Sequence, residues 1–464
     1  MEALLQIFAP MIVFVYHCFD RIVINGYLSM LSRPEQHVAY FFRHVVDKPC
    51  IAKEVLSERT GQYNRWVESF ARNHRIPLQW AEKGVRKEDF TRSCLRAMER
   101  KNRFGVYFIL KSMEQGTTFR SVQPKYQTDD PHYCILKKTR SRFTHYYFYI
   151  RDEKLGPLVI RIASYLPFQT TSYLNGHSFT ECELLRRGEL FRKNDNAFPS
   201  VRDPGALQHA AHRLTPEIIR ERLDYWILIV GPKFSPRERS TMNLRRFYAI
   251  SQIEYCYNVV FRRHFPIQRL FARSCELGIL TLTASKVASI FGWRLTRTLH
   301  GKLHTALDRI DHAHHTLRAY FKHSFVKQYE KFRTFLRFEV CSNNLSDLRL
   351  KKSLENLPSV RDTSQAIINR FATLQAPMLN VHFDFPLLER LALPLTHLNT
   401  CIAGIKIHDT RMIRLMEIML HTGSCLSGLP SAMIHETIVK TYELPHYTIN
   451  QVRYDFSFTN LAHR

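Results

Sequence analysis

Alternation of hydrophobic and polar positions is clearest between residues 326 and 344. Apolar residues at 336, 338 and 340 alternate there with Arg337, Glu339 and Cys341, which is the period of a half-buried strand. The preceding segment, 326–331, alternates in the same way. A turn near residues 332–334 would join the two segments, so the pattern predicts a β-hairpin over 326–342.

One face of this predicted hairpin carries Tyr329, Lys331, Arg337 and Glu339, depending on the register. A phenol, an ammonium, a guanidinium and a carboxylate in one patch can hold a phosphate or a metal, or supply a nucleophile. The same side chains can equally form a cross-strand ladder of ion pairs, worth about 0.2–1 kcal/mol per pair. Both interpretations stay open, and these four residues are the candidate catalytic set.

The first 200 residues combine helical and strand patterns. Apolar positions recur at helical spacing through residues 34–100, whereas 104–111, 141–152 and 158–168 have strand patterns, the last two forming a second hairpin. A helix is expected after Asn175 and Gly176, ending at Gly188. Residues 193–205 have the composition of a loop, which predicts a soft domain boundary near residue 200.

The rest of the chain is predicted to be mainly helical. Thr215 followed by Pro216 is typical of a helix start, with threonine as the N-cap. Residues 282–303 have the form of a helix-turn-helix with its turn at Gly292. A generic pair of amphipathic helices also fits this segment. In the helix-turn-helix interpretation, the second helix would present to nucleic acid the side chains of Arg294, Arg297 and Lys302.

The tail of the chain repeats the pattern of helix, short turn and helix. Its second helix, 448–456, would present side chains that can read base edges or hold phosphate, namely Asn450, Gln451 and Arg453.

These patterns together predict an α+β fold. We expect a mixed sheet with helices in the N-terminal half and a helix-rich C-terminal half with a β-hairpin and helix-turn-helix-like segments. The expected domains are 1–200, helical plus mixed sheet; 201–430, helix-rich around the hairpin 326–342; and 431–464, a partial helix-turn-helix-like tail.

The net charge of the chain indicates what kind of partner it binds. The chain has 67 Lys and Arg against 41 Asp and Glu, a formal net charge of +26 spread along its 464 residues. Such a field attracts polyanions, and nucleic acid is the expected partner. Aromatic residues in 143–149, flanked by Arg142 and Arg161, would suit stacking of single-stranded bases. Filling a core is the alternative for these rings.

The ten cysteines are scattered, and no two form a CxxC pair. Neither a structural zinc site nor a disulfide framework is therefore expected, and a reducing cytoplasm suits the composition. The apolar segment 3–16 is too short to span a bilayer, so the chain is expected to be cytoplasmic without a membrane partner.

Candidate metal chemistry is limited to histidines. His312 and His314, if in a strand, would project from one face beside a tyrosine nucleophile and hold Mg²⁺ or Mn²⁺, as in some nucleases. The segment 303–317 also fits a helix. No phosphate-binding GxxxxGK[ST] and no GxGxxG occurs, so no small-molecule cofactor is expected.

Two resemblances follow from particular segments. YEK followed by LRFE, in 329–339, is similar to the tyrosine-lysine and arginine-glutamate strands of plasmid and phage replication initiation factors. More broadly, the chain resembles a widespread uncharacterised bacterial protein family in FDRIVINGYL (19–28), THYYFYIRDEKLGPLVIRIASYLPF (144–168), YLNGH (173–177), NDNAF (194–198), IEY (253–255) and 327–344. The family resemblance implies a bacterial origin and a C-terminal module that is partial here; it implies no mechanism.

The sequence therefore predicts a nucleic-acid-binding protein of bacterial, mobile-element origin that binds phosphates through a basic surface. The first alternative is a metal-dependent endonuclease like a replication initiator or transposase, using Tyr329 with His312, His314 and Glu339. The second is a non-catalytic scaffold of a ribonucleoprotein or protein complex.

Overall fold

The fold is given by a computed structural model. It describes residues 1–29, 35–48, 51, 53–81, 87–123, 135–241, 245–263, 283–296, 303–311, 314–375, 395–397, 400–402, 415, 431–442, 444 and 446–453. The chain forms two compact units, 1–275 with 282–376, and 276–281 with 377–464. No helix of the described residues has the length and apolar character needed to cross a membrane.

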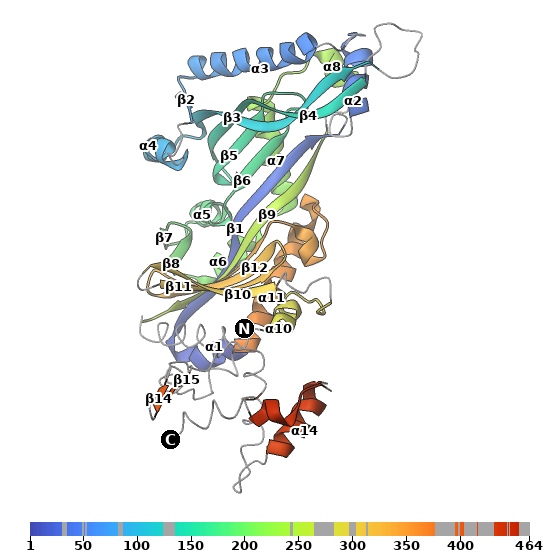
Figure 1. Ribbon diagram of the computed structural model, residues 1–464. Helices are drawn as coiled ribbons and strands as arrows, with labels where there is room; N and C mark the ends of the chain where they lie inside the picture. The colour runs from blue at the N-terminus through green and yellow to red at the C-terminus, as the bar shows by residue number, and fades with distance from the viewer. Residues whose placement is uncertain are drawn as a thin grey trace. The chain divides into compact units, whose positions relative to one another are not determined.

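A mixed sheet organises the first unit (Figure 1). Its strand order is β10 (Leu303–Asp311), β11 (His314–Phe321), β12 (Ser324–Lys331), β13 (Phe335–Ser342), β9 (Arg246–Phe261), β1 (Ile12–Leu28), β6 (Thr170–Leu174), β5 (Gly156–Ala163), β4 (Ile135–Asp152), β3 (Gly105–Val122) and β2 (Leu78–Trp80). β2 runs parallel to β3, and the other neighbours are antiparallel.

The long strands β1 and β9 join the two halves of the sheet. They pair from Ile12 to Leu28, whereas β6 pairs with β1 only over residues 22–26. The rest of that edge of β1 is covered by helix α6 (Pro204–His212), where Gln208 Oε1 accepts from the His17 backbone N–H at 2.9 Å and Nε2 donates to the His17 carbonyl at 3.1 Å. An amide side chain thus satisfies backbone groups that no strand reaches.

Helices cover both faces of the sheet around β1, β9 and β13. Helix α11 (Leu357–Gln375) packs on one face, where Phe371 meets Phe338 edge-on at 6.2 Å between ring centroids. Helices α5 (Gly176–Arg186) and α6 and the hairpin of β7 (Phe191–Asn194) and β8 (Ala197–Val201) cover the other face. Every residue of β13 is consequently buried, whereas its alternating sequence predicted one solvent-exposed face.

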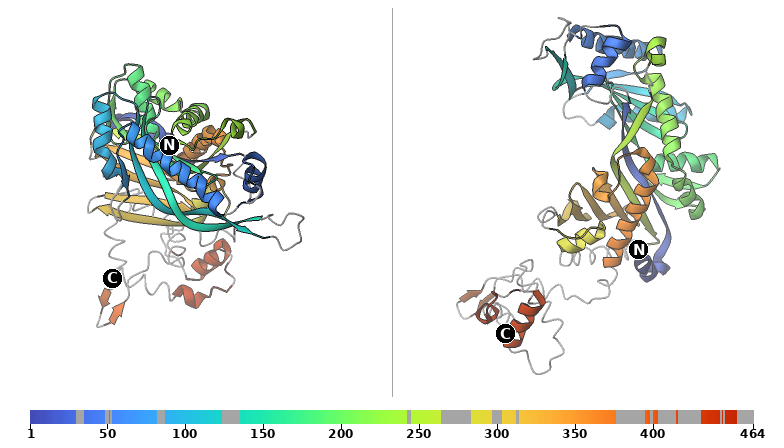
Figure 2. Two further views of the ribbon diagram at one scale, coloured as in Figure 1. Left: turned by 90° about the horizontal axis from the view of Figure 1, so that it is seen from above. Right: turned by 90° about the vertical axis from the view of Figure 1, so that its right-hand side faces the viewer.

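Helix α3 (Lys53–Asn73) lies along β3 and β4 (Figure 2). Asn64 accepts a hydrogen bond from Tyr146 at 3.1 Å, and Lys111 Nζ lies 2.6 Å from Glu68. The described residues of the unit also form the α-helices α1 (Glu2–Phe8), α2 (Glu35–Tyr40), α4 (Lys87–Arg100), α7 (Pro216–Val230), α8 (Pro236–Thr241) and α10 (Ala284–Ile290).

The described part of the second unit is small. It contains β14 (Leu395–His397), β15 (Thr400–Ile402), α14 (Ser431–Tyr442) and a helical turn at 449–453. Its buried residues are Leu415, Ile434, Ile438 and Val452.

The predicted α+β class with a mixed sheet is confirmed. The N-cap at Thr215 is also present, because its side chain accepts from the Ile218 N–H. The boundary expected near residue 200 does not separate two folding units, since β1 lies between β6 and β9 in one sheet. Residues 201–430 also supply five strands to that sheet instead of a single hairpin.

Two local predictions are wrong for identifiable reasons. Residues 193–205 are not a loop: they hold most of the β7–β8 hairpin, whose turn places Asp195 at φ 53°. The second helix expected after Gly292 is absent from 293–296, which are irregular. There Trp293 Nε1 donates to the Asp347 carbonyl at 2.8 Å.

Candidate functional site

A buried polar cluster lies where α5 and the β7–β8 hairpin cover the sheet. Arg337 of β13, 0% exposed, donates from Nε to Asn258 Oδ1 at 2.7 Å and from Nη2 to the Asn196 carbonyl at 2.6 Å. Its Nη1 lies 3.5 Å from Asp20 Oδ2. Asn196 Nδ2 is 2.6 Å from each Asp20 oxygen, and Lys331 donates to Asn196 Oδ1. The hairpin turn is therefore held between two cations and a carboxylate.

Two cysteines and a histidine adjoin this network. Cys18 of β1 pairs with Cys256 of β9 across the sheet, and their Sγ atoms are 3.9 Å apart. His177 Nε2 lies 3.3 Å from Cys18 Sγ and 3.9 Å from Cys256 Sγ. On the other side of the ring, His177 Nδ1 lies 3.0 Å from Asp20 Oδ1. Asn258 Nδ2 donates to Cys256 Sγ at 3.3 Å.

These contacts set the protonation of the cluster. Burial alone would raise the pKa of Asp20, but the neighbouring His177 and Arg337 outweigh it and hold that pKa well below its usual range. Burial alone would likewise raise the pKa of Cys256, but Cys18, Arg337 and His177 lower it. Burial and the contact with Cys256 raise the pKa of Cys18. The surroundings thus act on the two neighbouring thiols in opposite directions.

The predicted catalytic residues lie beside this cluster on one face of β12 and β13. The register pairs Tyr329 with Arg337 and Lys327 with Glu339. Tyr329 donates to Glu339 Oε2 at 2.8 Å, and Lys327 Nζ lies 3.0 Å from Glu339 Oε1. Burial and the charge of Glu339 raise the pKa of Tyr329 well above its ordinary value. The phenol is thus a hydrogen-bonded, protonated group.

Sequence reasoning missed the partners of these four residues. Asp20, Asn196, Asn258 and the pair of cysteines come from β1, the β7–β8 turn and β9, far apart in the sequence. A signal was available: the segments that carry the family resemblance include 19–28, 173–177, 194–198 and 327–344, and they meet here. The ring of His177 lies between the cysteines and Asp20.

Gly176 allows α5 to approach β1 closely enough for His177 to reach the cluster. A Cβ at this position would overlap the Phe19 carbonyl oxygen. We therefore expect Gly176→Ala to lower the free energy of unfolding by about 1–3 kcal/mol, because backbone must move. Urea denaturation measures this free energy.

Gly61→Ala is the matched control, since a Cβ there meets only the Arg65 side chain at 3.6 Å. Because Gly61 lies in the middle of a helix, this substitution should stabilise the protein by about 0.5–1 kcal/mol. Equal effects of the two substitutions would contradict the close approach.

A second candidate surface is a basic β-ribbon, which we define as residues 112–122 of β3 and 135–144 of β4. Over this stretch the two strands pair only with each other (Figure 2). The neighbouring strand β5 pairs with β4 only from His145 onward. Residues 137–142 are exposed on both faces of the ribbon. Its basic residues are Arg120, Lys137, Lys138, Arg140 and Arg142, and within the described chain none of them has an acidic partner.

The other predicted nucleic-acid residues differ in setting. Arg142 is exposed on the ribbon, but Arg161 is paired with Glu114 at 2.8 Å within the sheet. Tyr146 to Tyr149 are buried, so these rings fill the core and do not form a stacking platform. Arg294 is exposed in the irregular segment after α10, not on a recognition helix.

The remaining predicted residues lie partly outside the described residues. In the tail, Asn450, Gln451 and Arg453 are exposed on the short helix, but Gln451 Oε1 also accepts from the Thr448 N–H at 2.7 Å, as part of a helix cap. Arg297, Lys302 and His312 lie outside the described residues. The backbone of His314 begins β11, two residues before Thr316, which pairs with Tyr329.

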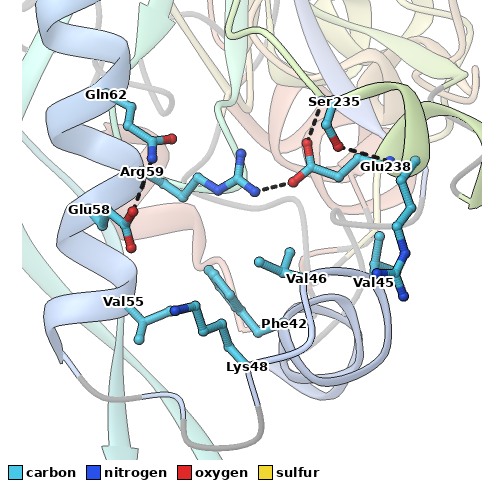
Figure 3. Close-up of a pocket in the computed structure, with 11 residues that line it drawn as sticks. Phe42, Val45, Val46, Lys48, Val55, Glu58, Arg59, Gln62, Ser235 and Glu238 are labelled. Carbon is cyan, nitrogen blue, oxygen red and sulfur yellow. Dashed lines mark hydrogen bonds and ion pairs between the residues drawn. The ribbon is translucent and has the colours of Figure 1, made fainter.

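Two pockets in the described part of the first unit are relevant to its chemistry. One, of about 470 Å³, reaches the buried cluster at Asp20 and Asn196 and has an aromatic wall that includes Tyr107 and Tyr173. The other, of about 340 Å³, lies between α3, α8 and the segment 42–48 (Figure 3). Its central ion pair joins Arg59 to Glu238, whose carboxylate also accepts a hydrogen bond from the Ser235 N–H at 2.7 Å.

Comparison with protein-family models, curated proteins and solved structures found no match. The candidate sites are therefore interpreted from their own residues.

Proposed function

We propose that this protein binds nucleic acid and that the basic β-ribbon is its main contact surface. The observation that supports the proposal is the row of five exposed cations, Arg120, Lys137, Lys138, Arg140 and Arg142, with no acidic residue in 115–122 or 135–144. Cations without partners retain their full attraction for phosphate, and the release of counterions from nucleic acid drives such binding.

The geometry of a ribbon also suits a groove. A two-stranded β-ribbon fits the major groove of duplex DNA. Lys138, Arg140 and Arg142 alternate along β4, so they lie on one face with Thr117 and Gln115, to which Arg140 and Arg142 are directly paired. Side chains two residues apart on a strand are separated by about 6.8 Å. One face of the ribbon therefore offers several cations and hydrogen-bonding groups to one backbone.

Binding of the full chain to labelled single-stranded DNA, duplex DNA and RNA tests the proposal. We expect affinity for at least one of them to fall steeply between about 50 and 200 mM salt, because phosphate contacts release counterions. Absence of binding to all three at about 50 mM salt would overturn the proposal. A bacterial mobile-element origin is proposed with it, on the two sequence resemblances alone.

The alternative, a metal-dependent endonuclease, makes a different prediction for Tyr329. As a nucleophile, Tyr329 would have to transfer its proton to a base, and Glu339 Oε2 at 2.8 Å is the neighbouring acceptor. With Mn²⁺ or Mg²⁺, the alternative predicts strand cleavage or a covalent adduct that Tyr329→Phe abolishes.

The binding proposal instead predicts that Tyr329→Phe leaves affinity unchanged and strands intact on denaturing gels. We expect this variant to lose about 1 kcal/mol of stability, the net value of one hydrogen bond. If the wild-type protein cleaves strands and this variant does not, the protein is an endonuclease and not only a binding protein.

A further inference from the structure

We propose that Cys18, His177 and Cys256 form a metal site, with Zn²⁺ as the expected ion. The three side chains come from β1, α5 and β9 and are buried together beneath the β7–β8 hairpin. Two thiolates and an imidazole are soft and borderline ligands, which favour Zn²⁺ over Mg²⁺ or Mn²⁺. This inference is independent of the proposed nucleic-acid binding.

The spacing of the ligand atoms supports a tetrahedral ion. Bond lengths of about 2.3 Å to sulfur and about 2.0 Å to nitrogen place tetrahedral ligand atoms about 3.8 Å apart for S and S and about 3.5 Å apart for S and N. The corresponding distances here are 3.9 Å between the Sγ atoms, and 3.3 and 3.9 Å from His177 Nε2 to Cys18 and Cys256. Three ligands are therefore already arranged around one point.

The surroundings of the three ligands also have the form of a metal centre. Asp20 Oδ1 lies 3.0 Å from His177 Nδ1, so it can hold the tautomer that leaves Nε2 free for a metal. A carboxylate is a usual partner for the second ring nitrogen of a metal-ligating histidine. Asn258 donates to Cys256 Sγ at 3.3 Å, and Arg337 and Asn196 in turn hold Asp20. The pocket of about 470 Å³ is lined by Asp20 and Asn196, so it reaches the carboxylate that contacts His177.

The other group of possible ligands among the described residues fits less well. Glu254, Glu339 and Cys341 also lie close together, but Lys327 Nζ is 3.0 Å from Glu339 and already neutralises that carboxylate. The alternative for the proposed site is a metal-free thiolate and imidazolium pair, which the same residues can form. Metal content distinguishes the two.

Elemental analysis of the full chain, purified without a polyhistidine tag and equilibrated with Zn²⁺ before dialysis, tests the proposal. We expect about one zinc per chain, lost in Cys256→Ser and in Cys18→Ser. Cys182→Ser, outside the cluster, is the control for thiols, and the double variant His312→Ala, His314→Ala is the control for the other histidines. Both controls should retain the ion.

A second measurement covers the case in which the cysteine variants fail to fold. The wild-type chain loaded with Co²⁺ should show an intense near-ultraviolet charge-transfer band from thiolate to metal. Folded wild-type protein without zinc and without this band would overturn the proposal. Zinc that the Cys256→Ser variant keeps, or that the His312→Ala, His314→Ala double variant loses, would also overturn it.

Discussion

Arg337→Met is expected to lower the free energy of unfolding by about 3–5 kcal/mol, the cost of breaking a buried ion pair by removing one partner. The substitution removes the hydrogen bonds at 2.7 Å to Asn258 and 2.6 Å to the Asn196 carbonyl, and it takes the nearest guanidinium away from Asp20. A methionine fills most of the volume, so the loss is mainly electrostatic. Urea denaturation followed by circular dichroism measures it.

A double-mutant cycle separates charge from packing. Adding Asp20→Asn to Arg337→Met removes the carboxylate that has lost its guanidinium neighbour, and part of the lost stability should return. Arg142→Met is the matched control, because that arginine is exposed on the ribbon, and its effect should stay within about 0.5 kcal/mol. If Arg337→Met cost no more than this control, the buried network would not stabilise the fold.

Neutralising the ribbon should give the largest change in binding. In the triple variant Lys138→Gln, Arg140→Gln, Arg142→Gln, we expect affinity for nucleic acid to fall about 10²-fold, from about 1 kcal/mol for each lost phosphate contact. The slope of log K against log salt should also decrease by about 2–3 units if all three contact phosphate. Filter binding or fluorescence anisotropy at several salt concentrations measures both quantities.

The matched control removes the same charge elsewhere. Arg333, Lys351 and Lys352 are exposed at the β12–β13 turn and after β13, and the triple substitution to glutamine again removes three positive charges. If attraction depended only on net charge, the two triple variants would bind equally. A specific ribbon surface instead predicts that this control retains most of the affinity and slope.

Local signals in the sequence predicted local structure well. The cap at Thr215 depends on contacts within three residues, and the β12–β13 hairpin on a turn of three residues between strands. The strand β1 lacks a regular alternation, because bulges at 12–14, 19–21 and 23–24 interrupt it and because much of the strand is buried on both faces. Its length was therefore not predictable from periodicity.

The candidate site could be predicted only on the hairpin. The alternation of Tyr329, Arg337 and Glu339 placed them on one face, and the register brings them together. The absence of a CxxC pair argued against a zinc site, but Cys18 and Cys256 are neighbours only because β1 pairs with β9, 238 residues along the chain. Spacing along the sequence carries no information about ligands that a sheet assembles from distant strands.

The measurement that most directly tests nucleic-acid binding by the ribbon is ultraviolet cross-linking of the full chain to labelled nucleic acid. Digestion with a protease that spares lysine and arginine, followed by mass spectrometry, would then locate the cross-linked peptides. The proposal predicts cross-links in residues 112–122 and 135–144, which the ribbon triple variant weakens. Cross-links confined to other segments, such as the tail helix at 449–453, would contradict it.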